Sequence, residues 1–398
     1  MTRRLLPRRA LWDALAGAVV LALFGLAIAG LYTHAPGYKR FSSGASSYVR
    51  YEKARVMAID KESLHRDTTS GLELGYQVAT LRILTGEHAG NVLTVKNALS
   101  YSSNVKAAAG SDVIICVDTA DKDTYEVWIY SYNRGPFLYL YVGLFVAALC
   151  TIGGGRGFRS VLGIIFTFTG IAFLFIPMLY RGYSPSLAAV GVVVITLCVS
   201  LVLLGGFSAK TLSAILGSLA GVVISILFVT VALQITHLTG FSTSEADALV
   251  QIAGATQMKA GELLFAAILI SSLGAIMDVA ISIASAVNEV SLNNGGLATR
   301  ALFNSGMNVG RDMMGTMANT LIIAFTGTSL NVLVLLYSMN VTYYQLINNN
   351  MIGVYIVQAV SGSIAVVLTV PLVSLASAYL IPGVRQRSQE SVLPGSAS

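Results

Sequence analysis

The chain has 398 residues, of which 55% are hydrophobic and only 11% are charged, and its formal net charge is +6. Soluble proteins carry about 25% charged residues, so this composition excludes a soluble globular protein and indicates a mainly α-helical membrane protein embedded in a lipid bilayer. The basic residues lie mostly in short loops and tails, as membrane orientation requires, and they give no reason to expect a nucleic-acid partner.

The first third of the chain is expected to hold an anchor and an external domain. Residues 1–33 have a basic start followed by an apolar run, which predicts a first transmembrane helix. Residues 34–135 are polar, and the stretches "SYVRYEKARVMAID", "YQVATLRILTGEHAGNVLTVKN", "SDVIICVD" and "YEVWIYSY" read as four to five strands. They predict a small β-rich domain, a barrel or sandwich, with an OB-like fold as one option. It would serve as a folded spacer or as a binding surface.

Residues 136–383 are expected to form a seven-helix transmembrane domain, and residues 384–398 a disordered cytoplasmic tail. With the first helix, eight apolar segments are long enough to span a bilayer. They lie at about 11–33, 136–153, 160–180, 186–206, 211–236, 262–287, 312–338 and 351–382.

The distribution of basic residues predicts the orientation. Counted through eight spans, one side holds most of them: Arg3, Arg4, Arg8, Arg9, Arg156, Arg159, Lys210, Arg300, Arg311, Arg385 and Arg387. The short loops on the other side hold only Arg181 and Lys259. The positive-inside rule then predicts a multi-pass membrane protein with both termini cytoplasmic and residues 34–135 outside.

One predicted helix carries a carboxylate among apolar residues, in "LGAIMDVAISIASAVNEV". Gly274, Asp278, Ser282, Ser285 and Glu289 follow one another at helical spacing and therefore share a face. A carboxylate in hydrocarbon costs roughly 3 kcal/mol at the low end. We therefore expect this face to contact protein or a water-filled cavity, with Gly274 allowing close helix packing.

A second polar face lies on the following helix, in "GMNVGRDMMGTMANTLIIAFTGTSL". Arg311, Gly315 and Asn319 recur every four residues, and Asp312, Thr316 and Thr320 do so one residue further around the helix. This face is a candidate to lie opposite the first one, with Gly315 as a packing position. Arg311 is placed to pair with Glu289 at the cytoplasmic border.

Three interpretations of these residues compete. The polar groups bond helices together, or Asp278 is a proton or cation site in a transport cycle, or Asp278 and Asp312 form the catalytic pair of an intramembrane aspartyl protease. The sequence before Asp278 is "GAIM" rather than Gly-x-Gly, which disfavours the protease. No spacing of His and Cys predicts a metal site, and no motif predicts a cofactor.

Longer stretches of this sequence resemble a known family. The runs "SSLGAIMDVAISIASAVNEV", "SGMNVGRDMMGTMANTLIIAF", "PMLYRGYSPSLAAV" and "GGFSAKTLSAILGSLAGV" are similar to the YibE/F family of bacterial multispanning membrane proteins, over roughly residues 50 to 382. That resemblance implies membership, topology and a place in a bacterial plasma membrane, and carries no activity with it. The pattern of Asp278, Glu289 and "GRDMMGTMANTL" more distantly resembles the bundles of RND-type exporters and SecD/SecF, which implies proton-motive coupling through Asp278.

We therefore expect a transport protein that moves an unknown small solute or ion, coupled to protons or cations through Asp278. Ser282, Ser285, Thr316, Asn319 and Thr320 would support that site, with Arg311 and Glu289 as a cytoplasmic gate. The alternative is a non-transporting scaffold or sensor whose external domain binds a partner. Besides the lipid bilayer, a second copy or another membrane protein is an expected partner.

Overall fold

The computed structural model describes residues 25, 48–119, 125–294 and 296–390. It is mostly helical, with a small β unit ahead of the helices. The chain divides into two compact units, one spanning residues 41–148 and the other holding the helices from Leu149 onward. Apart from Gly25, the predicted helix at 11–33 lies outside the described residues, as do residues 391–398. The predicted disordered tail at 384–398 is wrong for residues 384–390, because helix α11 continues to Glu390.

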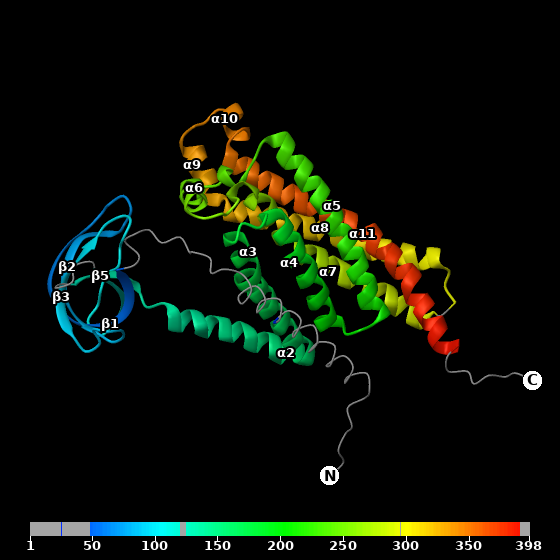
Figure 1. Cartoon of the computed structure of the whole chain (residues 1–398), viewed down its shortest axis with the longest axis horizontal. Coiled ribbons are helices and arrows are strands. Elements are labelled where there is room, and N and C mark those ends of the chain that lie inside the picture. Colours follow the sequence, from blue (N-terminus) through cyan, green and yellow to red (C-terminus); the bar gives the residue numbers. More distant parts are fainter. Residues whose placement is uncertain (1–24, 26–47, 120–124, 295, 391–398) are drawn as a thin grey trace, which may run out of the picture. The chain divides into compact units, whose positions relative to one another are not determined.

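The β unit is a five-stranded antiparallel sheet that curves into a half-barrel (Figure 1). Its strands are β1 (Val49–Arg66), β2 (Glu73–Ile83), β3 (Val92–Leu99), β4 (Asp112–Asp118) and β5 (Glu126–Tyr132). Their order is β3-β2-β1-β4-β5, so the long β1 is the central strand. The four quoted stretches thus form five strands, at the upper end of the expectation.

Alternation along the strands builds the core of this unit. Ala54, Val56, Leu81, Val113 and Ile115 are fully buried. On β1 and β2 they alternate with exposed residues such as Arg55 and Arg82, as period-two side-chain direction requires. The half-barrel therefore has its own apolar core, independent of the helices.

A buried amide network fastens a loop to this sheet. Gln77 of β2 is fully buried; its Nε2 donates to the Ala107 carbonyl (3.1 Å), and its Oε1 accepts from the Ala107 N–H (2.9 Å). Asn97 of β3 donates to the Val105 carbonyl (2.7 Å) and to Gln77 Oε1 (3.3 Å). The two amides thus bond the backbone of the 105–107 segment, which lacks a strand partner of its own.

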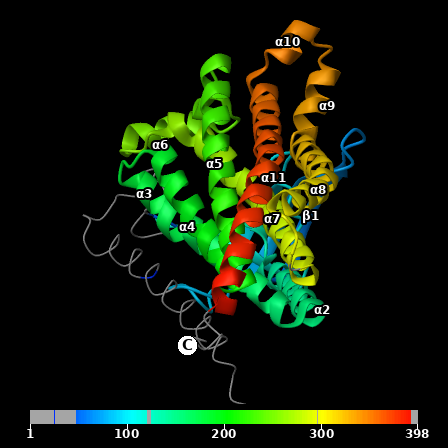
Figure 2. The ribbon, with the colours of Figure 1, turned by 90° about the vertical axis from the view of Figure 1, so that its right-hand side faces the viewer.

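The helices follow in chain order. They are α2 (Gly135–Gly170), the π-helical turn η2 (Ile171–Phe175), α3 (Ile176–Tyr180), α4 (Pro185–Gly205), α5 (Ala209–Thr236), α6 (Ala246–Ala255), α7 (Leu263–Asn293), α8 (Thr299–Thr328), α9 (Leu330–Ser338), α10 (Tyr343–Ile347) and α11 (Asn350–Glu390), with short 3₁₀ turns at Gly240–Ser242 and Ala260–Glu262. Figure 2 shows α5, α7, α8 and α11 running side by side, with α9 and α10 joining α8 to α11 at one end.

Five helical segments in the described residues are long and apolar enough to cross a membrane, and α8 with α9 adds a sixth if that pair, bent by 58°, is one span. The segments predicted at 136–153 and 160–180 fall together in one helical stretch, Gly135–Tyr180. Gly154 interrupts that stretch with non-helical angles of φ 54° and ψ −134°. The multi-pass helical architecture is therefore present, whereas eight spans and an OB-like fold stay predictions.

Small residues bring the helices of the bundle together. A Cβ at Gly217 or Gly221 of α5 would collide with Val373 or Thr369 of α11. A Cβ at Gly306 or Gly310 of α8 would likewise collide with α11. Lipid tails are as apolar as a helix surface, so the hydrophobic effect does not drive helices together in a bilayer. Close approach at these glycines instead favours association through van der Waals contact.

We expect Gly221→Ile to destabilise the bundle, because the new side chain meets Thr369 where no space exists. Overpacking of this kind typically costs about 1–3 kcal/mol. Thermal unfolding in detergent, followed by the loss of the monodisperse peak on size exclusion, measures the effect. Gly191→Ile on α4 is the matched control, because a Cβ there meets nothing within 4 Å. Equal midpoints for the two variants would contradict the close packing of α5 on α11.

Candidate functional site

Asp278 lies close to the middle of the membrane segment Ala260–Asn293, on the outward face of α7. Ile276, Val279 and Ile283 on the opposite face are fully buried. Gly274 and Asp278 are exposed, and Glu289 is exposed on the same side. Ser282 and Ser285, between them, are half-buried. The predicted polar stripe is therefore real, and within one chain it faces outward.

The Asp278 carboxylate has no hydrogen-bond donor and no cation partner among the described residues. Three ion pairs lie in the β unit and join Arg50 to Glu87, Arg55 to Asp112, and Lys106 to Glu73, and Asp278 takes part in none of them. Asp278 thus has no compensating partner among the described residues, and a carboxylate near the middle of a membrane-spanning helix is costly.

The second predicted stripe also faces outward. Arg311, Asp312, Gly315, Thr316, Asn319 and Thr320 are all exposed on α8. Thr316 and Thr320 return their hydroxyls to carbonyls of their own helix, at 2.8 Å each. Arg311 donates to Asn308 Oδ1 at 3.4 Å, and no ion pair joins it to Glu289 in the described part of the chain. The expected Arg311–Glu289 pair is therefore absent within one chain.

The two stripes do not face each other, which corrects the expected arrangement. α8 packs against the apolar face of α7, where Gly310 lies beside Ile283 and Gly306 beside Val287. Gly274 and Gly315 were expected to pack helices, yet a Cβ at either meets nothing within 4 Å. The close contacts are made instead by Gly306 and Gly310 of α8, which lie against the apolar face of α7.

These contacts also set the depth of α8. Gly306 lies level with Val287 of α7, and Leu321 and Ser272 both flank Gly362 of α11. α8 therefore runs antiparallel to α7 along the central part of its span, and the segment from Asn308 to Thr320 lies at the same level as Asp278. Two outward polar faces thus occur at one depth in the bundle.

Buried hydroxyls inside the bundle are a further polar feature, which the sequence patterns did not reveal. Ser200 on α4, Ser218 and Ser225 on α5, and Ser374 and Ser377 on α11 have buried oxygens without a hydrogen-bond partner among the described residues. In a sequence such serines look like ordinary small packing residues. Only the three-dimensional packing of the helices shows that these hydroxyls are buried.

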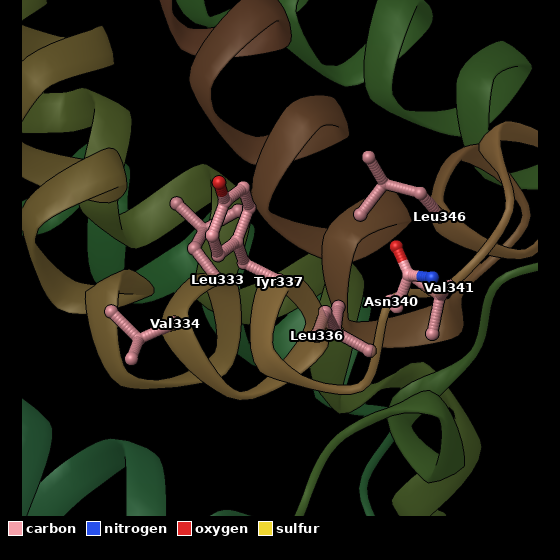
Figure 3. A pocket seen from close by; sticks show the side chains of 7 residues that line it. All are labelled: Leu333, Val334, Leu336, Tyr337, Asn340, Val341 and Leu346. Atoms are coloured by element: carbon pink, nitrogen blue, oxygen red, sulfur yellow. The ribbon is translucent and has the colours of Figure 1, made fainter.

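Two cavities in the described residues lie away from Asp278. One, of about 680 Å³, lies in the α9–α10 hairpin and is lined by Leu333, Val334, Leu336, Tyr337, Asn340, Val341 and Leu346 (Figure 3). The other, of about 460 Å³, lies between α4, α5 and the start of α7, with Glu262 at its edge. The carboxylate of Glu262 accepts from the Ser184 hydroxyl. Both linings are mainly apolar, so neither matches the polar stripes.

Comparison with known proteins identifies the helical part of the chain. A family model described as YibE/F-like protein matches residues 141–383, more than half of the sequence. The chain belongs to the YibE/F family. No curated protein and no solved structure matches it.

The YibE/F match begins within α2 and ends in α11, so it includes both polar stripes and lies outside the β unit. The resemblance stated from the quoted motifs is thereby confirmed for the helical region. Within the described residues of this YibE/F protein, no group of three or more His, Cys, Asp or Glu is placed to hold a metal ion. The family assignment carries no activity, so the chemistry must be argued from Asp278 itself.

Proposed function

We propose that this YibE/F protein moves a small solute or ion across the membrane, coupled to protons or cations through Asp278. The observation that carries the proposal is the unpaired carboxylate near the middle of the segment Ala260–Asn293. Ionisable residues at this depth are rare because of their cost, and they typically mark ion pathways and proton relays.

The proposed topology keeps eight spans, with both termini cytoplasmic and residues 34–135 outside, in a bacterial plasma membrane. The stretch Gly135–Tyr180 has 46 residues. At 1.5 Å per residue it would extend about 70 Å, more than twice the hydrocarbon thickness. The break at Gly154 therefore supports two spans joined by a turn. These two and the segment at 11–33 bring the total to eight.

In the proposed cycle Asp278 alternates between a charged state and a neutral one. Protonation or cation binding removes the cost of the bare charge, which lets the helix move relative to its surroundings. Ser282 and Ser285 lie on the same face of α7, where their hydroxyls can hydrate or coordinate the bound ion. Thr316, Asn319 and Thr320 provide further polar groups at that depth, and Arg311 and Glu289 act as charged gate residues towards the cytoplasm. Asp312 lies beside this gate.

The direct test is the infrared carboxyl band of the purified protein in lipid. We expect a protonated-carboxyl band whose intensity changes with bulk pH in the wild type and which is missing in Asp278→Asn. Such a band means that the carboxyl exchanges protons with the solvent, as coupling requires. A spectrum of Asp278 that is the same at every pH would overturn the proposal and leave helix packing as the role of this residue.

A scaffold or sensor role for the β unit is the second candidate, because an aromatic patch covers its outer side. Tyr51 of β1 and Trp128 and Tyr130 of β5 are exposed, and the rings of Tyr51 and Tyr130 meet edge to face with centroids 4.8 Å apart. Exposed aromatic clusters of this kind typically bind proteins or ligands. The strand order, with β3 and β5 at the two edges, is compatible with an OB-like barrel. A scaffold of this kind would tolerate Asp278→Asn.

A further inference from the structure

The outward face of α8 is unsuited to lipid, although the contacts of Gly306 with Val287 and of Gly310 with Ile283 hold α8 level with the candidate span Ala260–Asn293. From Asn304 to Asn319 the exposed positions include two charged and three amide side chains, namely Arg311, Asp312, Asn304, Asn308 and Asn319. A charged residue near the centre of a membrane helix costs about 2.5–3.5 kcal/mol on insertion scales. The contacts of Gly306 and Gly310 fix the apolar side of α8 on α7 and α11, so a rotation of α8 cannot hide the polar side.

We propose that this face of α8 is the interface between two copies of the chain. The α8 polar face comprises Asn308, Arg311, Asp312, Gly315 and Asn319. The inference stands on the surface alone and holds whether or not the protein is a transporter. It assigns a role to Gly315, where a Cβ would meet nothing within one chain.

The α8 polar face is complementary to itself under two-fold symmetry. The outward line of α8 runs through Asn308, Gly315 and Asn319. Arg311 and Asp312 lie on opposite sides of this line, next to each other on the helix surface. A two-fold axis parallel to α8 places Arg311 of one copy beside the partner's Asp312, and the reverse pair forms at the same height. Each charge thus gains an opposite partner, as an isologous interface requires.

The residues on the outward line fit the same arrangement. Asn308, Gly315 and Asn319 are separated by seven and four residues and so share one face. Gly315 lets two backbones approach closely, and an Asn amide can donate to and accept from the same Asn of a partner helix. The apolar segment at 11–33 lacks such groups between Asp13 and its far end, so it would leave the face unpaired. A second copy therefore fits the α8 polar face better than residues 11–33 do.

Disulfide cross-linking in native membranes tests the proposal. The three native cysteines, Cys116, Cys150 and Cys198, are first replaced by Ala. Asn319→Cys and Gly315→Cys are then expected to give an oxidant-dependent adduct of twice the 41.9 kDa chain mass. Val223→Cys is the matched control, because Val223 is 64% exposed on α5 near the middle of the span Ala209–Thr236. It should give no adduct.

Charge reversal provides a second readout that does not depend on the cysteine positions. In the Asn319→Cys background, Asp312→Arg places like charges opposite each other and should lower the adduct yield about tenfold. Adding Arg311→Asp to that variant restores opposite charges and should restore the yield. Equal adducts at Val223 and Asn319, an adduct of any other mass, no adduct at either α8 position, or no rescue by the double reversal would each overturn the proposal.

Discussion

Asp278→Asn is expected to abolish proton-coupled transport while leaving the protein folded. The substitution keeps the size and hydrogen-bonding shape of the side chain and removes its ability to change charge. Asp278 makes no ion pair or hydrogen bond with any described residue, so folding loses no contact when the charge is removed. The bundle should even become slightly easier to insert, because Asn is less costly than a charged Asp in hydrocarbon.

The measurement uses reconstituted vesicles that contain a pH-sensitive dye. A low-molecular-weight cell extract is supplied on one side so that the coupled solute is present. We expect the wild type to change the internal pH, and Asp278→Asn to fall about tenfold or more, towards the rate of protein-free vesicles. Asp247→Asn on the short helix α6 is the control for an acidic residue outside the long spans. A wild-type rate in Asp278→Asn would refute coupling through this residue.

The second large effect is expected in the β unit, from Gln77→Leu. Leu fills a similar volume but leaves the N–H and carbonyl of Ala107 and the Asn97 amide without the partner they have now. Each buried polar group left unpaired costs about 1–3 kcal/mol. Two or three of them remove a large part of the stability of about 5–15 kcal/mol that is usual for a folded domain.

Hydrogen exchange of the full-length protein, read by mass spectrometry, should report this loss. We expect β2, β3 and the 105–107 segment to lose protection in Gln77→Leu, whereas α4 to α11 keep theirs because they belong to the other compact unit. Arg82→Leu, an exposed change on the same strand, should leave the protection intact. If Gln77→Leu exchanges as slowly as the wild type, the buried amide network contributes little to the fold.

The sequence predicts many elements of this fold well because each leaves a local signal. The five strands follow from alternation, since this pattern depends only on neighbouring residues. The spans from α4 onward follow from apolar length. The helical stretch that joins 136–153 to 160–180 is harder to predict. The glycines around Gly154 are typical of a helix end, yet the structure is interrupted by non-helical angles at Gly154 alone.

The placement of the site could not be predicted in the same way. Helical periodicity correctly groups Gly274, Asp278 and Glu289 on one face, but it holds no information about which neighbour that face meets. The choice depends on shape: the glycines Gly306 and Gly310 let α8 approach Ile283 and Val287, on the other side of α7. The interior hydroxyls, such as those of Ser218 and Ser374, escape prediction for the same reason, because their burial depends on helices that are distant in sequence.

The central position of β1 has a consequence for how the protein is made. β1 pairs with β2 nearby in sequence, but its other edge pairs Val49 with Asp118. Such long-range pairing raises the contact order, and loop closure over many residues slows folding. During synthesis one edge of β1 therefore stays open until β4 has emerged, and an open strand edge is a template for aggregation. The half-barrel is therefore prone to aggregation for a period during its synthesis, and the rate at which residues 67–118 are translated sets the length of that period.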